Sequence, residues 1–339
     1  MEEQKMEFNH LFIVTHTDLD GIGSAAATLR LLSRSESDST ILFAEPYNIG
    51  DVLSDIKDSV DRGDLLIIAD LGVNKNAFEK ALGIIKDLAR RGSIIEWYDH
   101  HVWSPEEINS LEKLGVKVVI DRSTCATGVV ARYLKGLEAF ESDKLLIELE
   151  SVVCSADLWK WDHPLSPKLF RVVGERREGE EWKRKLAYKM AKGVLWDEEM
   201  EAKLEEYVNL ELKGFSRVLN NAYTSNSNGA IIAVTYKNFS GPPSSSMIGA
   251  LLLSRFNADI AAIVRSDGGL SLRSKNFNVQ ALAKALGGGG HPKAAGAKIR
   301  IPIYIKLLSL IYPKITSYYT FKIVSSTLKS ITINNFIQQ

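Results

Sequence analysis

Three short stretches of the chain carry carboxylate side chains, and two of them also carry imidazoles. They are His16-Thr17-Asp18-Leu19-Asp20-Gly21, Ala69-Asp70-Leu71-Gly72 and Tyr98-Asp99-His100-His101, and Asp157 is a fourth candidate. So many carboxylates can share one place only if cations neutralise them. Carboxylate and imidazole ligands without thiolates favour manganese, magnesium or a similar divalent ion. Two such ions about 3.5–4 Å apart would activate a water and stabilise the leaving oxygen of a phosphoryl displacement.

The elements before these stretches predict where the side chains meet. Apolar runs that predict buried strands are Leu11–His16, Ile41–Pro46, Leu65–Asp70, Ile94–Asp99 and Val116–Asp121. Helical periodicity lies between them, at Gly21–Ser33, Asp51–Val60, Lys75–Arg90 and Pro105–Leu114. This alternation predicts an α/β fold with a doubly wound parallel sheet. Ligands of such sheets collect outside the carboxyl ends of the strands, so three acidic clusters should meet at one edge.

The pattern changes after Asp121. Helices are predicted at Thr127–Phe140, at Lys144–Ser155 and, in two pieces, at Glu180–Asn221, followed by a linker at Thr224–Gly229. A smaller α/β unit follows, with strands Ile231–Tyr236, Ala261–Arg265 and Gly269–Lys275 and helices Ser244–Phe256 and Val279–Leu286. We therefore expect a first domain at residues 8–195, a helical linker at 196–229 and a second, smaller domain at 230–310. The tail, 311–339, stays unassigned.

Composition limits the class of protein. The 42 basic and 42 acidic residues cancel, so any contact with nucleic acid should be local. Cys125 and Cys154, the only cysteines, cannot build a disulfide framework or a cysteine-rich zinc site, and neither is expected to have a chemical role. The charged first residues lack an apolar signal region, and no run reaches the roughly 20 apolar residues of a membrane span. We expect a soluble cytoplasmic protein without a membrane partner, and a homodimer is left open.

Each residue also has an ordinary structural explanation. A single aspartate at the end of a strand, such as Asp70, is usually a helix cap or a turn residue. A lone histidine is more often a satisfied polar residue than a ligand, so His10 and His163 are placed outside the site. Gly21-Ile22-Gly23 resembles half of a dinucleotide-binding fingerprint, but its third glycine is missing. The conjunction of three acidic strand ends, two of them with histidine, favours the metal site.

Together and in this order, the four acidic stretches resemble the motifs of the DHH phosphoesterase superfamily. This group includes RecJ-type exonucleases, nanoRNases, cyclic-dinucleotide phosphodiesterases and family II pyrophosphatases. The second unit resembles the DHH-associated C-terminal domain through its glycine run and histidine, Gly288-Gly289-Gly290-His291-Pro292-Lys293-Ala294-Ala295-Gly296. The resemblance covers roughly residues 10 to 300.

The resemblance implies a role for each residue of the motifs. The ligands of two Mn²⁺ ions, for which Mg²⁺ or Co²⁺ could substitute, would be His16, Asp18, Asp20, Asp70, His100 and Asp157. Asp70 would bridge both ions, whereas His16 ligates metal only in parts of the family. Asp99 would orient its neighbours, and His101 would lie close to the substrate phosphate and stabilise developing charge.

In the second unit, chemistry and resemblance point to a phosphate-binding site. A glycine run exposes backbone N–H groups to a phosphate, and Gly288, Gly289 and Gly290 would do so here. Arg273 would hold a phosphate bidentately, and His291 could donate to the same group. The alternative for four successive glycines is a flexible linker. The substrate would lie between the two units.

Several substrates remain open. Pyrophosphatases of the superfamily have a different C-terminal domain without the glycine run, which argues against pyrophosphate as the substrate. Long-chain exonucleases of the superfamily usually carry further binding modules, which argues against a long nucleic acid. The preferred activity is 3′–5′ hydrolysis of short single-stranded RNA or DNA to nucleoside monophosphates. A cyclic-dinucleotide phosphodiesterase or a 3′,5′-bisphosphate nucleotide phosphatase is the enzymatic alternative. A nucleotide-binding sensor without turnover, or an inactive scaffold associated with replication, is the alternative of another class.

Overall fold

The described residues, 8–174 and 179–331, fold into two units in this computed structural model. The first unit is Met1–Leu204 and the second is Glu205–Gln339, so the boundary falls within the long helix α10 (Glu198–Asn220). Among the described helices, none combines the length and the apolar content that crossing a bilayer requires.

The first unit is built on a five-stranded parallel sheet in the order β2-β1-β3-β4-β5. The strands are β1 (Leu11–His16), β2 (Ser39–Ala44), β3 (Leu65–Ala69), β4 (Ile94–Asp99) and β5 (Lys117–Ile120). Every pairing is parallel, and β1 lies between β2 and β3 in direct register. The doubly wound sheet predicted from the apolar runs is therefore confirmed.

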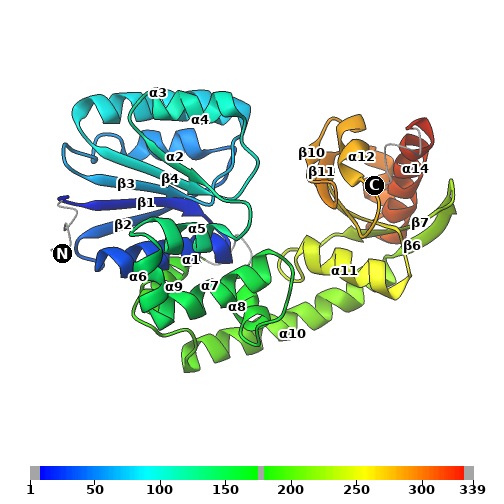
Figure 1. Cartoon of the computed structure of the whole chain (residues 1–339). Coiled ribbons are helices and arrows are strands. Elements are labelled where there is room, and N and C mark those ends of the chain that lie inside the picture. The colour runs from blue at the N-terminus through cyan, green and yellow to red at the C-terminus, as the bar shows by residue number, and fades with distance from the viewer. Residues whose placement is uncertain (1–7, 175–178, 332–339) are drawn as a thin grey trace. The chain divides into compact units, whose positions relative to one another are not determined.

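Helices cover both faces of this sheet (Figure 1). On one face lie α2 (Ile49–Ile56), α3 (Lys75–Arg91) and α4 (Pro105–Glu112), which share an apolar core with alternate residues of the strands. On the other lie α1 (Leu19–Leu32), α5 (Ala126–Tyr133), α7 (Lys144–Asp157), α8 (Ser166–Val173) and α9 (Glu180–Ala191). Burial on both faces explains why β3, Leu-Leu-Ile-Ile-Ala, is wholly apolar.

The helical region departs from the prediction in two places. The helix expected at Thr127–Phe140 is broken into α5 and α6 (Leu137–Ser142), because Gly136 adopts a positive φ of 89° between them. The short helix α8 was not predicted, although its Ser-Pro start is typical of a first helical turn.

A disulfide joins Cys125 and Cys154, although the sequence predicts no disulfide framework and no chemical role for either cysteine. Cys125 lies immediately before α5 and Cys154 lies within α7. The bond therefore fastens together two helices that meet against α1. Cysteines 29 positions apart in a chain with no others carry no pattern that predicts pairing.

The second unit contains a six-stranded sheet in the order β10-β11-β9-β8-β7-β6. Its strands are β6 (Tyr223–Ser227), β7 (Ala230–Lys237), β8 (Ile260–Arg265), β9 (Gly269–Ser274), β10 (Gly289–Gly290) and β11 (Ala294–Lys298). Only β7 and β8 pair in parallel. The helices are α11 (Ser245–Arg255), α12 (Val279–Ala285), α13 (Ile303–Leu308) and α14 (Lys314–Ser330).

The linker expected at Thr224–Gly229 is wrong. These residues form most of β6 and the tight turn Asn228-Gly229, which leads directly into β7. Both turn residues have positive φ, as the favoured two-residue hairpin turns require. The Asn-Gly pair predicts such a hairpin, but the polar strand before it has no apolar alternation.

Part of the unassigned tail belongs to the core of the second unit. Helix α14 buries Phe321, Val324 and Leu328 against the sheet. Residues 332–339 of that tail lie outside the described residues.

Candidate metal centre

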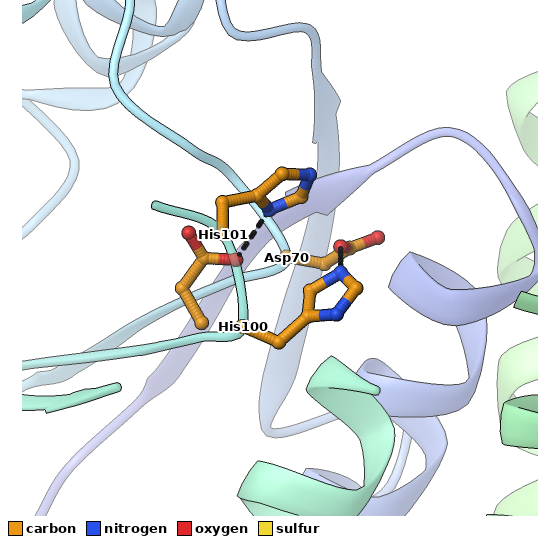
Figure 2. A group of neighbouring side chains, drawn as sticks. Asp70, His100 and His101 are labelled. Atoms are coloured by element: carbon orange, nitrogen blue, oxygen red, sulfur yellow. Dashed lines mark hydrogen bonds and ion pairs between the residues drawn. The ribbon is translucent and has the colours of Figure 1, made fainter. Parts of the chain in front are cut away.

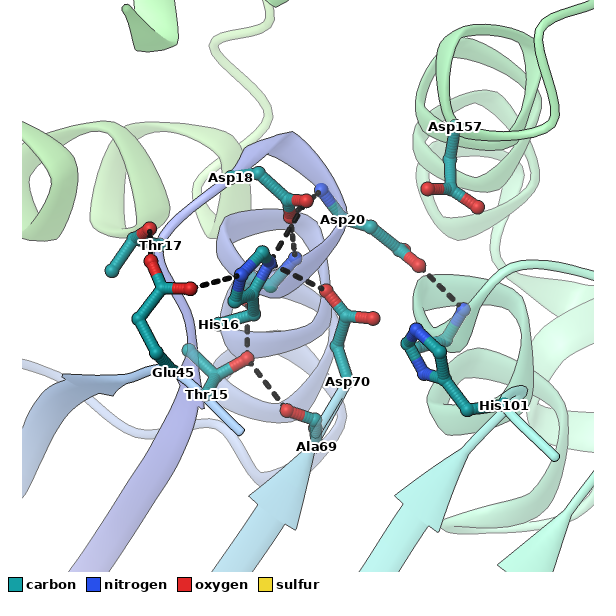
Figure 3. A network of polar contacts seen from close by, with 12 residues as sticks. Thr15, His16, Thr17, Asp18, Asp20, Glu45, Ala69, Asp70, His101 and Asp157 are labelled. Carbon is teal, nitrogen blue, oxygen red and sulfur yellow. Dashed lines mark hydrogen bonds and ion pairs between the residues drawn. The ribbon is translucent and has the colours of Figure 1, made fainter. Parts of the chain in front are cut away.

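The three acidic stretches do meet at one edge of the first sheet. His16 ends β1 and Asp70 follows β3, and their side chains lie together with those of Asp18 and Asp20 (Figure 3). Asp99 ends β4, and His100 and His101 follow it. Asp157 reaches the same place from the last residue of α7. The described part of the chain contains three groups of candidate ligand residues. Within each group, the ligand atoms all lie within 4.8 Å of one another. The groups are His16, Asp18, Asp70; Asp20, His100, Asp157; and Asp70, Asp99, His100, His101.

The first group is arranged around His16. Its Nδ1 lies 2.8 Å from Asp18 Oδ2 and 3.7 Å from Asp70 Oδ2. The other oxygen of Asp18 accepts from the backbone N–H groups of Asp20 and Gly21, so this carboxylate also caps α1. One imidazole therefore faces two carboxylates, one from the segment after β1 and one from the segment after β3.

The second group is arranged around His100, which follows β4. Its Nε2 lies 3.7 Å from Asp20 Oδ2 and 3.5 Å from Asp70 Oδ1. Its Nδ1 lies 3.8 Å from Asp157 Oδ2. These separations exceed a hydrogen bond, so the imidazole stands among three carboxylates without being fixed to any of them.

His101 is held differently. Figure 2 shows His101 beside His100 and Asp70. The Nδ1 atom of His101 lies 2.8 Å from Asp99 Oδ1, and the indole N–H of Trp103 donates to the other oxygen of Asp99 at 2.7 Å. Asp99 is fully buried, and both its oxygens are engaged. Asp99 is therefore placed to fix the orientation of the His101 ring.

The Asp20 carboxylate is bound by the start of α5. It accepts from the N–H groups of Ala126 at 2.7 Å and Thr127 at 2.8 Å, and from the Thr127 hydroxyl at 2.7 Å. Two glycines allow this approach. A Cβ on Gly23 would lie 2.5 Å from the Thr127 hydroxyl, and one on Gly21 would lie 2.2 Å from the His16 carbonyl oxygen.

Non-glycine residues with left-handed backbone lie in and beside the site. Asp70 has φ 56°, and Trp159 and Trp161, just after Asp157, have φ 59° and 58°. Such backbone is strained for residues with a Cβ and persists where the surroundings impose it. The two tryptophans pack edge-on against each other and against Phe170, which supports a packing role for them.

Two carboxylates are left without full compensation. Oδ2 of Asp70 and Oδ2 of Asp157 are buried and accept no hydrogen bond among the described residues. Burial and the negative charge of Asp20 raise the pKa of Asp70 well above its usual range and that of Asp157 to about 8. Orphaned buried oxygens beside imidazoles fit divalent cations, which would supply the missing charge.

At other residues of the site, partners of opposite charge shift the pKa so that the charged form is favoured. Burial opposes the charged form of Asp18 and Asp99, but the pKa of each is lowered, by His16 and by His101 respectively. For His16, burial disfavours the charged imidazolium and by itself would lower the pKa. The carboxylates of Asp18, Glu45 and Asp70 outweigh burial and raise this pKa well above 6.5.

His10 and His163 lie away from the cluster, as expected. His10 contacts the Thr40 hydroxyl and His163 contacts Glu148.

In the second unit, Arg273 is a desolvated cation. It lies in β9, where Nη1 donates to its neighbour's carbonyl and Nη2 donates to the Ser246 hydroxyl at 3.1 Å. No carboxylate pairs with it among the described residues, and burial lowers its pKa. Gly249 makes room for it, since a Cβ there would lie 2.6 Å from Arg273 Cγ. An uncompensated guanidinium beside a serine hydroxyl suits an anionic ligand.

The glycine run is structured, so it is not a flexible linker. Gly289 and Gly290 form β10 and pair with β11, and a Cβ on Gly288 would lie 2.0 Å from the Gly296 carbonyl oxygen. The amide of Gly288 already donates to Ala283, so it is not available to a phosphate. Among the glycines of β10, only Gly289 has open space around its Cβ position. His291 lies in the turn between β10 and β11.

Comparison with known proteins now assigns the family. Residues 10–156 match the model of the DHH family, N-terminal domain, and residues 228–309 match that of the DHHA1 domain. The chain belongs to the DHH superfamily. It carries the DHH-associated domain after the DHH domain. Family membership and the acidic and imidazole cluster identify it as a hydrolase of the phosphoesterase class.

Solved structures share the fold of this DHH protein. An exopolyphosphatase-related protein from Bacteroides fragilis is 16% identical, with a TM-score of 0.58 over 93% of this chain and 94% of the other. RecJ from Thermus thermophilus in complex with Mn²⁺ is 15% identical, with a TM-score of 0.57 over 94% of this chain. This chain spans 52% of that RecJ. An exonuclease RecJ bound to manganese is 16% identical, with a TM-score of 0.54 over 96% of this chain and 93% of the other. No curated protein matches the sequence.

Several residues of the first unit that contact the site were not predicted from the sequence, among them Thr127, Glu45 and Lys183. Glu45 follows β2 and places Oε2 3.3 Å from His16 Nε2 and Oε1 3.2 Å from the Thr17 hydroxyl. Lys183 of α9 is buried and donates to the Thr17 carbonyl at 2.7 Å. Glu45 could have been found, because it lies at the carboxyl end of the predicted strand Ile41–Pro46, which reaches the same edge of the sheet. Lys183 lies in a charged helix and carries no such pattern.

We predict that the metal-free DHH protein loses stability as pH rises from about 5 to 9. The unfolded chain releases the protons of Asp70 and Asp157 near pH 4, whereas the folded chain keeps that of Asp157 until about pH 8. Because the unfolded state then binds fewer protons, the free energy of unfolding falls through this window. The raised pKa of His16 acts in the same direction above pH 6.5.

Urea unfolding at a series of pH values in a chelator would measure this slope. Adding Mg²⁺ should flatten or reverse it, since cations bind the deprotonated carboxylates. The variant Asp157→Asn should show a shallower slope without metal. A metal-free protein that becomes more stable towards pH 9 would contradict the electrostatic account.

A second prediction concerns Glu45. Glu45→Gln keeps the shape of the side chain but removes the negative charge that faces His16 Nε2. Loss of such an orienting partner should weaken the affinity for Mn²⁺ by roughly 10- to 100-fold. Calorimetric titration with Mn²⁺ measures the affinity, and Glu36→Gln, an exposed glutamate of the same unit, is the matched control. Equal affinities in the two variants would remove Glu45 from the site.

Proposed function

We propose that this chain is a manganese-dependent phosphodiesterase that degrades short single-stranded oligonucleotides from the 3′ end and releases nucleoside monophosphates. The observation that carries the proposal is the meeting of six candidate ligands, His16, Asp18, Asp20, Asp70, His100 and Asp157, at one edge of the sheet. Asp70 belongs to two of the three groups of ligand atoms, as a residue that bridges two ions would. A structural network of ion pairs would not leave oxygens of Asp70 and Asp157 without donors.

The chain's own residues have separate tasks in this proposal. Two bound divalent ions would lower the pKa of a water and neutralise charge on the phosphate. Asp20 and Asp18 are held in place by backbone amides, so they need no rearrangement to act as ligands. Asp99 fixes the His101 ring through Nδ1, so Nε2 is the atom that approaches the scissile phosphate and stabilises its developing charge.

The DHH-associated domain supplies a site for a second phosphate or a terminal nucleotide. Arg273 supports this assignment because it is desolvated and lacks a carboxylate partner among the described residues. Ser246 lies beside it in the first turn of α11, a helix whose N-terminal amides favour an anion. Gly289 and His291 complete the proposed site, since Gly289 is the glycine most open to a ligand. Gly288 and Gly290, which were also expected to bind the phosphate, pack against the neighbouring strand instead.

The alternatives differ in substrate or in class. The similar structures include an exonuclease RecJ and an exopolyphosphatase-related protein, so both nucleic-acid and polyphosphate chains should be tested. The zero net charge favours a short substrate over a polymer track. A cyclic dinucleotide or a 3′,5′-bisphosphate nucleotide presents the same phosphate groups. An inactive scaffold is disfavoured, since the whole set of candidate ligands is present. We place the reaction in the cytoplasm.

The central test is Asp70→Ala with Mn²⁺ present. Removing the carboxylate shared by two ligand groups should lower turnover by at least about a thousandfold. The exposed Asp55→Ala on α2 is the matched control and should keep full activity. The substrate panel comprises di- to decanucleotides, cyclic dinucleotides, a 3′,5′-bisphosphate nucleotide, polyphosphate and pyrophosphate. Unchanged hydrolysis in Asp70→Ala would refute the site, and a wild type without turnover on any substrate would favour the scaffold.

A further prediction separates binding from chemistry. Arg273→Ala should raise KM for a dinucleotide by about 10- to 100-fold, the loss expected for one charge-assisted phosphate contact, with kcat changed less. Arg255→Ala, an exposed arginine of the same domain, should leave both constants unchanged. Steady-state kinetics over a range of substrate concentrations measure both. A fall in kcat with constant KM would place Arg273 outside substrate binding.

A further inference from the structure

The segment from α13 to the start of α14 exposes an unusual amount of apolar surface. Seven large apolar residues here are each more than half exposed, from 52% for Leu308 to 90% for Ile311. They form what we call the apolar ridge: Ile303, Tyr304, Leu307, Leu308, Leu310, Ile311 and Tyr312. Elsewhere in the described chain, the large apolar residues exposed to this extent stand singly, at Tyr47, Val102, Leu137 and Leu212. Isolated apolar residues are ordinary on a surface, whereas a contiguous group marks an interaction site.

The ridge is held by the fold. With 3.6 residues per turn, Ile303, Tyr304, Leu307 and Leu308 lie on one side of α13. Ile301 and Ile305 are buried in the core of the second unit with Phe321 of α14. After the helix, the amides of Ile311 and Tyr312 donate to the carbonyl of Leu308, which closes a turn. The apolar side chains are therefore presented to solvent by a backbone that is itself anchored.

The stretch of sequence that carries the ridge is basic. Asp267 is the last acidic residue of the chain, and every charged residue after it is basic: Arg273, Lys275, Lys284, Lys293, Lys298, Arg300, Lys306, Lys314, Lys322 and Lys329. Lys306 lies within α13 and Lys314 begins α14, while Lys298 and Arg300 precede the ridge. A net charge of zero for the whole chain therefore conceals a basic C-terminal part. The complementary partner is anionic.

We propose that the apolar ridge inserts into the surface of an anionic lipid bilayer. Aliphatic side chains that enter the acyl region, two tyrosines suited to the headgroup level and flanking lysines are the features of an interfacial anchor. Each lysine or arginine near an anionic membrane adds electrostatic attraction. The segment is too short to cross the bilayer, and no described helix could do so. The sequence lacks a membrane-spanning segment, which led to the expectation of no membrane partner, but binding to the surface of a bilayer needs no such segment.

Two other occupants fit less well. A second copy of the chain would bring the Lys306 and Lys314 of both copies to the same contact, where like charges repel. A single-stranded nucleic acid would match the charge, but proteins bind bases through aromatic rings, and most of the ridge is isoleucine and leucine. Lipid satisfies both the charge and the aliphatic surface.

Vesicle sedimentation tests the proposal with the full-length protein. The wild type should bind vesicles of phosphatidylcholine with about one-third phosphatidylserine, at least about tenfold more tightly than vesicles of phosphatidylcholine alone. High salt should weaken the binding. Leu310→Ser with Ile311→Ser should reduce it at least about tenfold, because two aliphatic groups no longer enter the acyl region. The matched control, Leu137→Ser with Leu212→Ser, removes two exposed but isolated leucines and should bind as the wild type does.

The folding of each variant is checked by thermal unfolding, and hydrolysis in solution should be unchanged, since the ridge is not part of the metal centre. This independence separates the proposal from the proposed activity. Three results would overturn it: no binding to anionic vesicles, equal loss in both double variants, or a ridge-dependent dimer in light scattering without vesicle binding. Ridge-dependent binding to oligo(U), with no affinity for vesicles, would assign the surface to nucleic acid instead.

Discussion

The buried carboxylate of Asp20 is the interaction on which the arrangement of the first unit depends. Its two oxygens accept from two backbone amides and one hydroxyl at the start of α5. The partial positive charge at a helix N-terminus stabilises a carboxylate there. This contact docks α5 against the first turn of α1, and the disulfide then ties α7 to the start of α5. Asp157, at the end of α7, is delivered to the strand ends as a result.

The remaining charges at the site are compensated unevenly. Asp18 and Asp99 each face an imidazole and additional N–H donors, whereas Asp70 and Asp157 each retain a buried oxygen without a donor among the described residues. A protein interior tolerates uncompensated carboxylates poorly, so this pattern distinguishes an ion-binding site from a network of structural ion pairs. The left-handed backbone of Asp70 fits the same explanation, since strain is retained where a side chain must point to one place.

Sequence predicted the parts of the fold that depend on apolar patterning. The strands of the first sheet are continuous apolar runs, and their parallel order placed Asp18, Asp70 and His100 at one edge. Features set by three-dimensional contact were not predictable in this way. Glu45 stands alone before a proline, β6 is polar along its length, and the pairing of Cys125 with Cys154 depends on two helices meeting.

The glycine run shows why residue type alone did not settle the second site. Glycine permits both close approach of a ligand and close packing of strands. At Gly288 and Gly290, the neighbouring strand occupies the space, so packing accounts for the residue type there. The sequence around Arg273 indicates an anion-binding site less strongly than the glycine run does. The folded unit indicates it more strongly, because Arg273 is partly buried beside the Ser246 hydroxyl.

The long separation between Asp20 and its partners has a consequence for biosynthesis. The amides that hold this carboxylate come 106 and 107 positions later in the chain, and Asp157 is translated later still. A ribosome that has released only the first strands exposes the earliest motif without the helices that complete it. Ions therefore meet a finished site only after α7 has emerged, so the part of the chain up to α7 leaves the ribosome without a complete centre at which to capture them.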